Sequence, residues 1–327
     1  MSIDVLCLRP EADFQRVGAL PPASLKVVYR APGDADVPEL MKQALALVIP
    51  AVGPKLPNGL FENTNVNFVQ VTGAGLDRLD LPYMKQCGIA VANVPGGSNE
   101  AVAEYAVTAA SVLLRRFAWA DAEIRKGNYR EFRARMIADS LQGLDGLTVG
   151  IVGFGIIGVA VASAFHKRGC LIFYHDPAAP RDPRTAEAIG AKPCTLRDLF
   201  QLSDVISLHV PLLPQTTGLI GARELAMMKP DAILIQSSRG GVVDEAALAE
   251  ALKAGRLGGA AVDVYSAEPP GADNPLLALT GEAAQRILFT PHIAGVTRQS
   301  TAFLCRAAWR NIERVFGGKE APLDVVT

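Results

Sequence analysis

The sequence predicts an α/β protein with two domains, each built on its own parallel β-sheet. At 327 residues the chain is long enough for about two domains. Half of its residues are hydrophobic, so sizeable cores can form. Two series of short apolar runs, one in the first hundred residues and one beyond Leu147, alternate with longer segments of helical periodicity. Because consecutive positions in these runs are apolar, both faces of each strand are expected to be covered, as in a parallel sheet.

The first series predicts the smaller sheet. Proline and glycine cluster between its apolar runs, which lie at 5–8, 26–29, 45–49, 67–71 and 89–94. The fourth run leads into the glycine-rich turn Gly73-Ala74-Gly75. Unpaired backbone N–H groups in such a turn form a nest for an anion, although an ordinary turn has the same composition.

Two helices are expected to connect the domains. From Ser98 to about Lys126, apolar residues follow helical spacing, which predicts one long helix that enters the second domain. The last helix, about Gln299 to Phe316, is expected to return to the first domain. These crossings place one discontinuous domain at 1–98 plus 296–327 and a central domain at 99–295. We expect a hinge at the crossings and a ligand site in the cleft between the domains.

The second series contains the most informative motif of the chain, Gly153-Phe-Gly155-Ile-Ile-Gly158. It follows the first of the apolar runs 147–152, 171–176, 204–210, 232–237, 259–265 and 287–290, and it opens a helical segment. Asp176 ends the second run. Strand, glycine turn, helix, strand and terminal acid in this order are typical of a dinucleotide site. Gly153 permits a tight turn, Gly155 lets the backbone approach a pyrophosphate, and Gly158 lets the helix pack closely on the strand. The sequence therefore predicts two Rossmann-like domains, of which 99–295 binds a dinucleotide.

A clear helix also follows the fourth run of this series. It is expected from Ala246 to Ala254, with Asp244 as its N-cap and Gly255 as its stop.

Composition excludes several other classes. A formal net charge of −1, from 32 basic and 33 acidic residues, gives no sign of a nucleic-acid or membrane-surface binder. No uncharged apolar run approaches the ~20 residues of a membrane span, and no signal peptide is recognisable. The five cysteines form no CxxC pair and no metal-ligand spacing; we expect buried, reduced thiols, no metal and a cytoplasmic location.

Three segments of the second series carry groups suited to acid–base chemistry. Arg239 lies beside a Gly-Gly turn after an apolar strand, where its planar fork can bind a carboxylate with two hydrogen bonds. Glu268 precedes two prolines that stiffen its backbone. His292 follows a strand and Pro291, and histidine can give and take a proton near neutral pH. Because the strands of an open α/β sheet bind ligands at their carboxyl ends, these three side chains are expected to meet there.

The other three histidines suit other positions. His166 lies inside the helix after the glycine turn, His175 neighbours Asp176, and His209 ends a strand before Pro211. We expect packing or surface positions for the first two and a place near the cofactor crevice for the third.

The chain resembles the D-isomer-specific 2-hydroxyacid dehydrogenases over nearly its full length. The matching segments are Gly73-Ala-Gly-Leu-Asp77, Asn93-Val-Pro-Gly96 with Val102-Ala-Glu104, Gly153–Gly158 with Asp176, His209-Val-Pro211, Arg239-Gly240 with Val243-Asp244, Asp263-Val264 with Glu268-Pro269, and Thr290-Pro-His292-Ile-Ala-Gly295. Together they are a specific signature.

The resemblance implies the family's mechanism and cofactor, NAD (NADH) without a metal. It implies that Arg239 binds the substrate carboxylate and polarises the 2-oxo group, that His292 is the acid and base, and that Glu268 hydrogen-bonds His292. The amides of Gly73, Ala74 and Gly75 are implied to hold the same carboxylate. The implied cofactor contacts are Val102, Gly153, Gly155, Ile156, Ile157, Gly158, Asp176, Val210, Pro211, Ser237, Asp263, His292 and Gly295. Asp176 is expected to bind the ribose hydroxyls and to favour NAD over NADP, with Arg181 close enough in sequence to leave NADP open.

A few positions depart from the family's common pattern. Gln236 stands where the family often has Asn, and Ile156 and Ile157 stand in the glycine turn without the Arg of some relatives. Arg78 stands where Asn is usual, and it is either a solvent-facing side chain or a cation for a second anionic group on the substrate. Lys55 is a second candidate for that contact.

Three functions remain open from the sequence. The favoured one is reduction or oxidation of a small 2-oxo or 2-hydroxy acid. A phosphorylated hydroxy acid such as 3-phosphoglycerate is the rival substrate. The family also includes NAD-sensing corepressors that bind proteins, but the full catalytic trio argues against a pure binding role. A homodimer is a family expectation.

Overall fold

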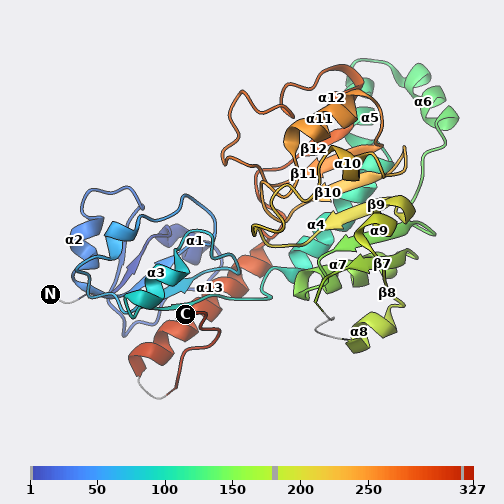
Figure 1. Ribbon diagram of the computed structural model, residues 1–327. Helices are drawn as coiled ribbons and strands as arrows, with labels where there is room; N and C mark the ends of the chain where they lie inside the picture. Colours follow the sequence, from blue (N-terminus) through green and yellow to red (C-terminus); the bar gives the residue numbers. More distant parts are fainter. Residues whose placement is uncertain (1–2, 179–182, 318–319) are drawn as a thin grey trace. The chain divides into compact units, whose positions relative to one another are not determined.

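The computed structural model describes residues 3–178, 183–317 and 320–327. The chain forms two compact units: Met1–Ser98 together with Val296–Thr327 is unit 1, and Asn99–Gly295 is unit 2 (Figure 1). Both units are α/β with all-parallel sheets, which confirms the predicted fold class. The assignment of substrate binding to unit 1 remains a prediction.

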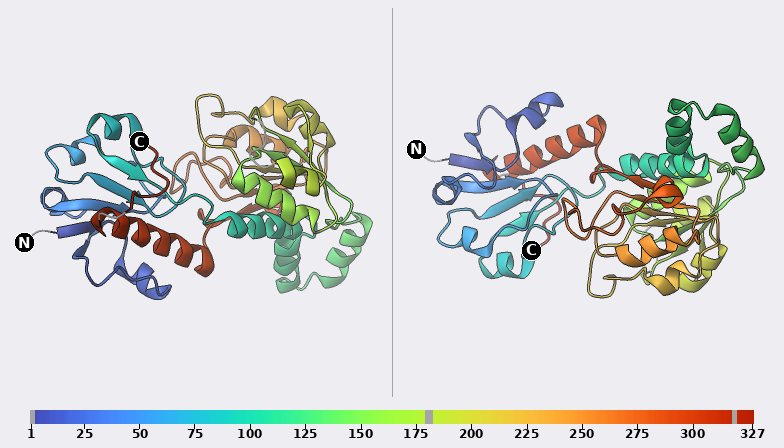
Figure 2. Two further views of the ribbon diagram at one scale, coloured as in Figure 1. Left: turned by 90° about the horizontal axis from the view of Figure 1, so that it is seen from below. Right: turned by 90° about the horizontal axis from the view of Figure 1, so that it is seen from above.

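Unit 1 is a five-stranded sheet in the order β2-β1-β3-β4-β5. Its strands are β1 (Ile3–Cys7), β2 (Val27–Tyr29), β3 (Ala44–Ile49), β4 (Phe68–Val71) and β5 (Ala90–Ala92). Its helices are α1 (Glu11–Arg16), α2 (Val37–Met41), the 3₁₀ turn η1 (Asn58–Phe61), α3 (Leu81–Gln86) and α13 (Arg298–Gly317). Helices α1 and α13 cover one face around Phe14 and Trp309, and α2 and α3 cover the other around Met41 and Met84 (Figure 2). All five predicted strands are confirmed.

Unit 2 is a seven-stranded sheet in the order β12-β11-β10-β9-β6-β7-β8. Its strands are β6 (Thr148–Val152), β7 (Leu171–His175), β8 (Lys192–Pro193), β9 (Val205–Leu208), β10 (Ile233–Gln236), β11 (Gly259–Val262) and β12 (Ile287–Phe289). Its helices are α4 (Asn99–Leu114), α5 (Phe117–Arg125), α6 (Tyr129–Ala138), α7 (Ile156–His166), α8 (Pro183–Ala188), α9 (Leu196–Leu202), α10 (Ala222–Leu225), α11 (Glu245–Lys253) and α12 (Gly281–Gln285). The six predicted strands are confirmed, and only the two-residue β8 was not expected.

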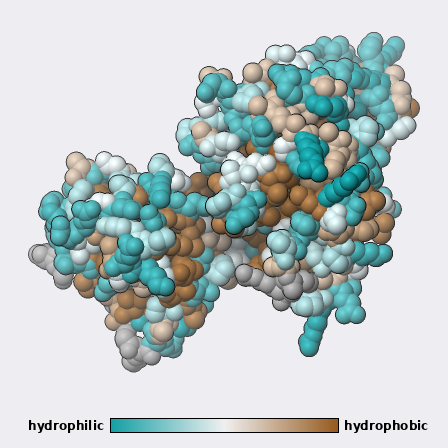
Figure 3. Space-filling view, viewed as in Figure 1, coloured by the Kyte–Doolittle hydropathy of each residue, from teal (hydrophilic) through white to brown (hydrophobic). Residues whose placement is uncertain are grey.

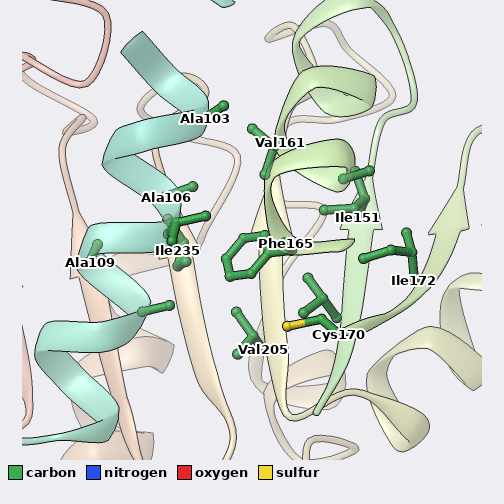
Figure 4. Packing of buried hydrophobic residues seen from close by; sticks show 14 of the residues in the cluster. Ala103, Ala106, Ala109, Ile151, Val161, Phe165, Cys170, Ile172, Val205 and Ile235 are labelled. Carbon is green, nitrogen blue, oxygen red and sulfur yellow. The ribbon is translucent and has the colours of Figure 1, made fainter. Parts of the chain in front are cut away.

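Small side chains let the helices on one face of this sheet pack closely. Helix α4 buries Ala103, Ala106 and Ala109, and it packs against α7. Phe165 of α7 fills the centre of the cluster, between α4 and strand β6 (Figure 4). On the opposite face, α9, α10 and α11 bury a second apolar cluster. The predicted N-cap of α11 is confirmed, because the Asp244 carboxylate accepts from the N–H groups of Ala246 and Ala247 at 3.0 Å.

The prediction of one long helix from Ser98 to Lys126 is wrong. Helix α4 ends at Leu114, and Arg116 takes a left-handed conformation with φ of 51°, after which α5 begins. The guanidinium of Arg116 binds Asp139 and lies 5.5 Å from the ring centroid of Trp119, so tertiary contacts hold the break. No glycine or proline marks it in the sequence.

Two further expectations concern cysteines and membranes. Cys7, Cys170 and Cys305 are buried as expected and Cys194 is partly buried, but Cys87 is exposed, since it directly follows the short helix α3 at its surface end. Within the described ranges, no helix is long and apolar enough to cross a membrane.

Candidate active site

Strand β6 marks the point where the chain order in the sheet of unit 2 reverses. From β6 the chain proceeds to β7 and β8 on one side, and then to β9, β10, β11 and β12 on the other. In open α/β sheets, ligands bind outside the carboxyl ends of the strands at such a point. The glycine turn follows β6 and the His209-Val210-Pro211 segment follows β9, so both lie at this edge.

Each glycine of the turn has a distinct environment. Gly153 has φ of +89°, and a Cβ there would lie 2.4 Å from the carbonyl oxygen of His209. A Cβ on Gly158 would lie 2.0 Å from the carbonyl oxygen of Gly153, so close helix–strand packing excludes it. A Cβ on Gly155 would meet nothing within 4 Å. The open space above Gly155, at the first turn of α7, fits the approach of a pyrophosphate to free N–H groups.

Asp176 lies beside this turn. Its Oδ2 accepts from the N–H of Phe154 at 2.7 Å, and its Oδ1 accepts from the N–H of Ala178 at 2.8 Å. The carboxylate is therefore fixed by backbone and partly exposed, as a ligand of ribose hydroxyls must be. Arg181, the possible NADP contact, lies outside the described residues.

Ser237 supplies an independent sign of a ligand site. It follows β10 at the same sheet edge, and its Oγ is buried without a hydrogen-bond partner among the described residues. A buried hydroxyl left unpaired costs about 1–3 kcal/mol, so a ligand that pairs with it is favoured. The residues at this edge therefore fit a bound dinucleotide.

Apolar side chains also reach the surface along this edge. Ile156, Leu212 and Leu213 are 46%, 40% and 48% exposed. Figure 3 shows hydrophobic surface between hydrophilic areas on the face of unit 2 that it presents. Of the other predicted cofactor residues, Val102 is buried, Ile157, Val210 and Gly295 are partly exposed, and Pro211 is exposed.

His292 and Glu268 are brought together, 24 residues apart in sequence. His292 Nδ1 lies 2.8 Å from Glu268 Oε2, and the second oxygen of Glu268 accepts from the N–H of Tyr265 at 3.1 Å. The two side chains keep 25% and 31% of their surface exposed. With Nδ1 bound to Glu268, the imidazole has Nε2 left to exchange a proton with a ligand.

The other three histidines are placed differently. His209 Nε2 lies 2.8 Å from Ser207 Oγ, and burial lowers the pKa of His209 to about 3, so it stays neutral. His175 Nδ1 lies 3.0 Å from the carbonyl oxygen of Cys194. His166 is exposed near the end of α7. None of the three has a carboxylate partner among its contacts in the described part of the chain.

Arg239 lies in a turn that packs against the segment leading to Glu268. A Cβ on Gly240 would lie 1.8 Å from the carbonyl oxygen of Tyr265, so the two loops touch through their backbones. Gln236 donates to the carbonyl oxygen of Arg239 at 2.8 Å and accepts from Ser238 Oγ at 2.8 Å. Gln236, a departure from the family pattern, thus holds the turn that carries Arg239.

The buried carboxylate of Asp263 holds the loop after β12. It is fully buried, and its oxygens accept from Thr290 Oγ1 at 2.6 Å and from the N–H groups of Ile293 and Ala294 at 2.8 Å each. We expected Asp263 as a cofactor contact only, and its bonds to this loop were missed. The apolar strand around an acid was a signal that a specific partner must satisfy it.

In unit 1, the turn at Gly73-Ala74-Gly75 is fixed by its carbonyl groups. The oxygen of Gly73 accepts from the N–H of Val94 at 2.9 Å, and the oxygen of Ala74 accepts from Asn93 Nδ2 at 2.8 Å. A Cβ on Gly73 would lie 2.7 Å from that of Ala51. Within the described residues, no hydrogen bond donated by the three amides is found, which suits an anion nest.

Arg78 takes neither of its two expected positions. It is 2% exposed, and its guanidinium donates to the carbonyl oxygens of Pro54 at 2.9 Å and Pro50 at 3.1 Å. Burial lowers the pKa of Arg78. The side chain therefore fixes the loop after β3, where a shorter residue such as Asn does not reach. Lys55 in that loop is largely exposed, 3.9 Å from Asp80 Oδ2.

The described residues contain no group of three or more His, Cys, Asp or Glu that could hold a metal ion.

Residues 107–294 match the family model described as "D-isomer specific 2-hydroxyacid dehydrogenase, NAD binding domain". The chain is 35% identical to a glyoxylate reductase of Thermococcus litoralis, over 91% of this chain and 88% of that protein. It is 30% identical to a hydroxypyruvate reductase of Blautia hydrogenotrophica, over 99% and 98%. A D-3-phosphoglycerate dehydrogenase of Archaeoglobus fulgidus is 37% identical over 72% of this chain, and the chain spans only 42% of that protein.

Solved structures are similar to this chain over nearly its full length. The apo-structure of D-lactate dehydrogenase from Escherichia coli covers all of both chains with a TM-score of 0.80 at 26% identity. The TT0316 protein from Thermus thermophilus gives a TM-score of 0.82 at 29% identity, over 99% of this chain and 100% of that chain. The chain therefore belongs to the D-isomer specific 2-hydroxyacid dehydrogenases, a family of NAD-dependent oxidoreductases, and unit 2 contains its NAD-binding domain.

Proposed function

We propose that the protein interconverts a small D-2-hydroxy acid and its 2-oxo acid with NAD as cofactor. The observation that carries this proposal is the 2.8 Å pair between His292 and Glu268 at the sheet edge that also bears the glycine turn. A histidine fixed by a carboxylate and left partly exposed is suited to transfer a proton. Bound NADH supplies the hydride that reduces the 2-oxo carbon.

The chain's own residues handle the proton and the charges of the substrate. In reduction, His292 gives its Nε2 proton to the oxygen of the carbonyl group, which becomes the hydroxyl; in oxidation it accepts that proton. Glu268 keeps Nδ1 of His292 protonated and the ring oriented. Arg239 binds the substrate carboxylate as a fork and polarises the 2-oxo oxygen. The amides of Gly73, Ala74 and Gly75 are proposed as further ligands of the carboxylate.

A substrate screen tests the function directly. We expect purified protein to oxidise NADH with glyoxylate, hydroxypyruvate or another small 2-oxo acid, and to reduce NAD with the matching D-hydroxy acid but not the L-isomer. The screen measures absorbance at the NADH band with NADH and NADPH at one pH. Turnover of the L-isomer alone would contradict the stereochemistry, and the absence of any turnover would contradict the proposal.

A phosphorylated substrate is the second candidate. It is favoured by the identity to phosphoglycerate dehydrogenases, although the chain spans only part of them. The burial of Arg78 under the loop after β3 argues against direct contact with a phosphate, and Lys55 is the remaining exposed cation in that loop. A higher kcat/KM for 3-phosphoglycerate than for unphosphorylated hydroxy acids, lost in Lys55→Met, would favour this candidate.

A protein that only senses NAD is the remaining alternative. Tight NADH binding without turnover of any 2-oxo acid would favour it. The same screen therefore separates the two classes once NADH affinity is measured beside it.

Asp176→Ala should narrow the preference for NAD over NADP. The carboxylate meets a 2′-phosphate with like charge, and its removal also loses the bond to the ribose hydroxyls. We expect kcat/KM for NADH to fall and that for NADPH to change little or rise. An unchanged ratio would show that another residue sets the preference.

A homodimer and a cytoplasmic location remain predictions from the family. Light scattering of the purified protein tests the dimer, and fractionation of cells that express the protein tests the location.

A further inference from the structure

A chain of three hydrogen-bonding side chains connects helix α4 to the loop that carries His292. Tyr105 Oη lies 2.8 Å from Thr290 Oγ1, and Thr290 Oγ1 donates to Asp263 Oδ1 at 2.6 Å. A hydroxyl has one proton to give, and Thr290 gives it to the carboxylate. Tyr105 is therefore the donor in its bond with Thr290. Burial raises the pKa of Tyr105 to about 12, so its hydroxyl stays protonated and able to donate.

Asp263 also holds the backbone at and after His292. Its carboxylate accepts from the N–H groups of Ile293 and Ala294, and its carbonyl oxygen accepts from the N–H of His292 at 2.8 Å. His292 has φ of 54°, a left-handed conformation that is unfavourable for a residue with a Cβ. Such a conformation persists only where the surroundings over-determine it. Here the surroundings are three bonds to a single aspartate.

Removing the tyrosine hydroxyl should loosen this arrangement without opening a cavity. Thr290 Oγ1 would lose the bond that it accepts, so its side chain would be held at this end only by the bond that it donates to Asp263. Networks of this kind are stiff when every member is satisfied and lose that stiffness when one member is removed.

We propose that Tyr105 is a positioning residue for His292, acting through Thr290 and Asp263. Tyr105 does not touch the reacting atoms in this role; it limits the orientations of the ring that transfers the proton. The expected change in kcat rests on the proposed function, whereas the expected change in the orientation of the His292 ring does not depend on any substrate.

Tyr105→Phe tests the role kinetically. We expect kcat to fall about threefold to tenfold, the range that one hydrogen bond supports, with the KM for NADH within about twofold of wild type. Thr290→Val should lower kcat by a similar or larger factor, and Thr290→Ser, which keeps the hydroxyl, should restore most of it. Because both residues act through one path, Tyr105→Phe should cause no further fall in the Thr290→Val background.

Tyr265→Phe is the matched control. Its hydroxyl is also buried in this region, but it shares its one proton between the backbone carbonyls of Thr290 at 3.0 Å and Val262 at 3.2 Å and does not contact the Thr290 hydroxyl or Asp263. We expect its kcat within about twofold of wild type. An equal loss in Tyr265→Phe, or effects of Tyr105→Phe and Thr290→Val that add, would overturn the proposal in favour of general stabilisation.

A second readout needs no turnover. In protein labelled with ¹⁵N-histidine, the imidazole signals of His292, assigned with His292→Gln, should be single and sharp in wild type and Tyr265→Phe. In Tyr105→Phe they should broaden or double as the ring samples further orientations. Unchanged signals would overturn the positioning role. If wild type turned over no 2-oxo acid, the function would fail while the signals still decided the positioning role.

Discussion

Replacing His292 by alanine is expected to lower turnover by about 10²–10⁴-fold, the usual contribution of a positioned acid or base. The imidazole is the group that Glu268 orients at 2.8 Å. Of the other histidines, His209 is held by Ser207 and His175 by the backbone of Cys194, and His166 is exposed at the end of α7. NADH affinity should stay nearly intact, because we propose that the glycine turn and Asp176 make most of the contacts with the cofactor. Steady-state kinetics give the turnover, and titration of NADH fluorescence gives the affinity.

His166→Gln is the matched control for this prediction. It removes an exposed imidazole from α7 and should leave both quantities unchanged. The turnover of Glu268→Gln should lie between that of the control and that of His292→Ala. The glutamine amide can still accept a hydrogen bond from the ring, but it carries no charge. A loss below tenfold in His292→Ala would count against its proton role, whatever the control shows.

The elements of the fold were predictable where the pattern of side chains is local. The strands of both sheets are short runs of apolar residues, and parallel strands covered on both faces leave that pattern in the sequence. The proximity of His292 and Glu268 was also expected, because each follows a strand and the carboxyl ends of parallel strands share one edge. Whether these residues and Arg239 act on one substrate remains a prediction.

Features fixed by contacts between distant residues were not predictable. The break at Arg116 depends on Asp139 and Trp119 and has no glycine or proline to mark it. Arg78 is buried because two carbonyl groups of another loop accept from it, whereas an arginine after a turn usually faces solvent. Tyr105 fits the apolar spacing of α4, so its sequence pattern gave no sign that its hydroxyl reaches Thr290.

Alanine at Gly158 is expected to lower the stability of the fold, whereas alanine at Gly155 is expected to weaken cofactor binding and leave the stability unchanged. A methyl group on Gly158 would lie 2.0 Å from a backbone oxygen and 3.3 Å from Ile151, so α7 must move away from β6. Overpacking of this kind lowers the free energy of unfolding by about 1–3 kcal/mol. A methyl group on Gly155 meets no protein atom within 4 Å, and its φ of −75° suits alanine. The apo-protein with Gly155→Ala should therefore be as stable as wild type within about 0.5 kcal/mol.

The same Gly155 methyl group would occupy the open space where we propose that a pyrophosphate approaches the N–H groups of α7. We expect NADH affinity of Gly155→Ala to fall at least tenfold, a loss of about 1.4 kcal/mol or more. Urea unfolding of the apo-proteins and NADH fluorescence titration separate the two effects, since each variant is the other's control. Wild-type NADH affinity in Gly155→Ala would show that the pyrophosphate binds elsewhere. A free energy of unfolding of Gly158→Ala equal to that of wild type would show that the close contact between α7 and β6 does not contribute to stability. Both glycines belong to one short motif. Loss of stability in Gly158→Ala and loss of NADH affinity in Gly155→Ala would show that the space around each glycine, rather than the motif as a whole, decides its role.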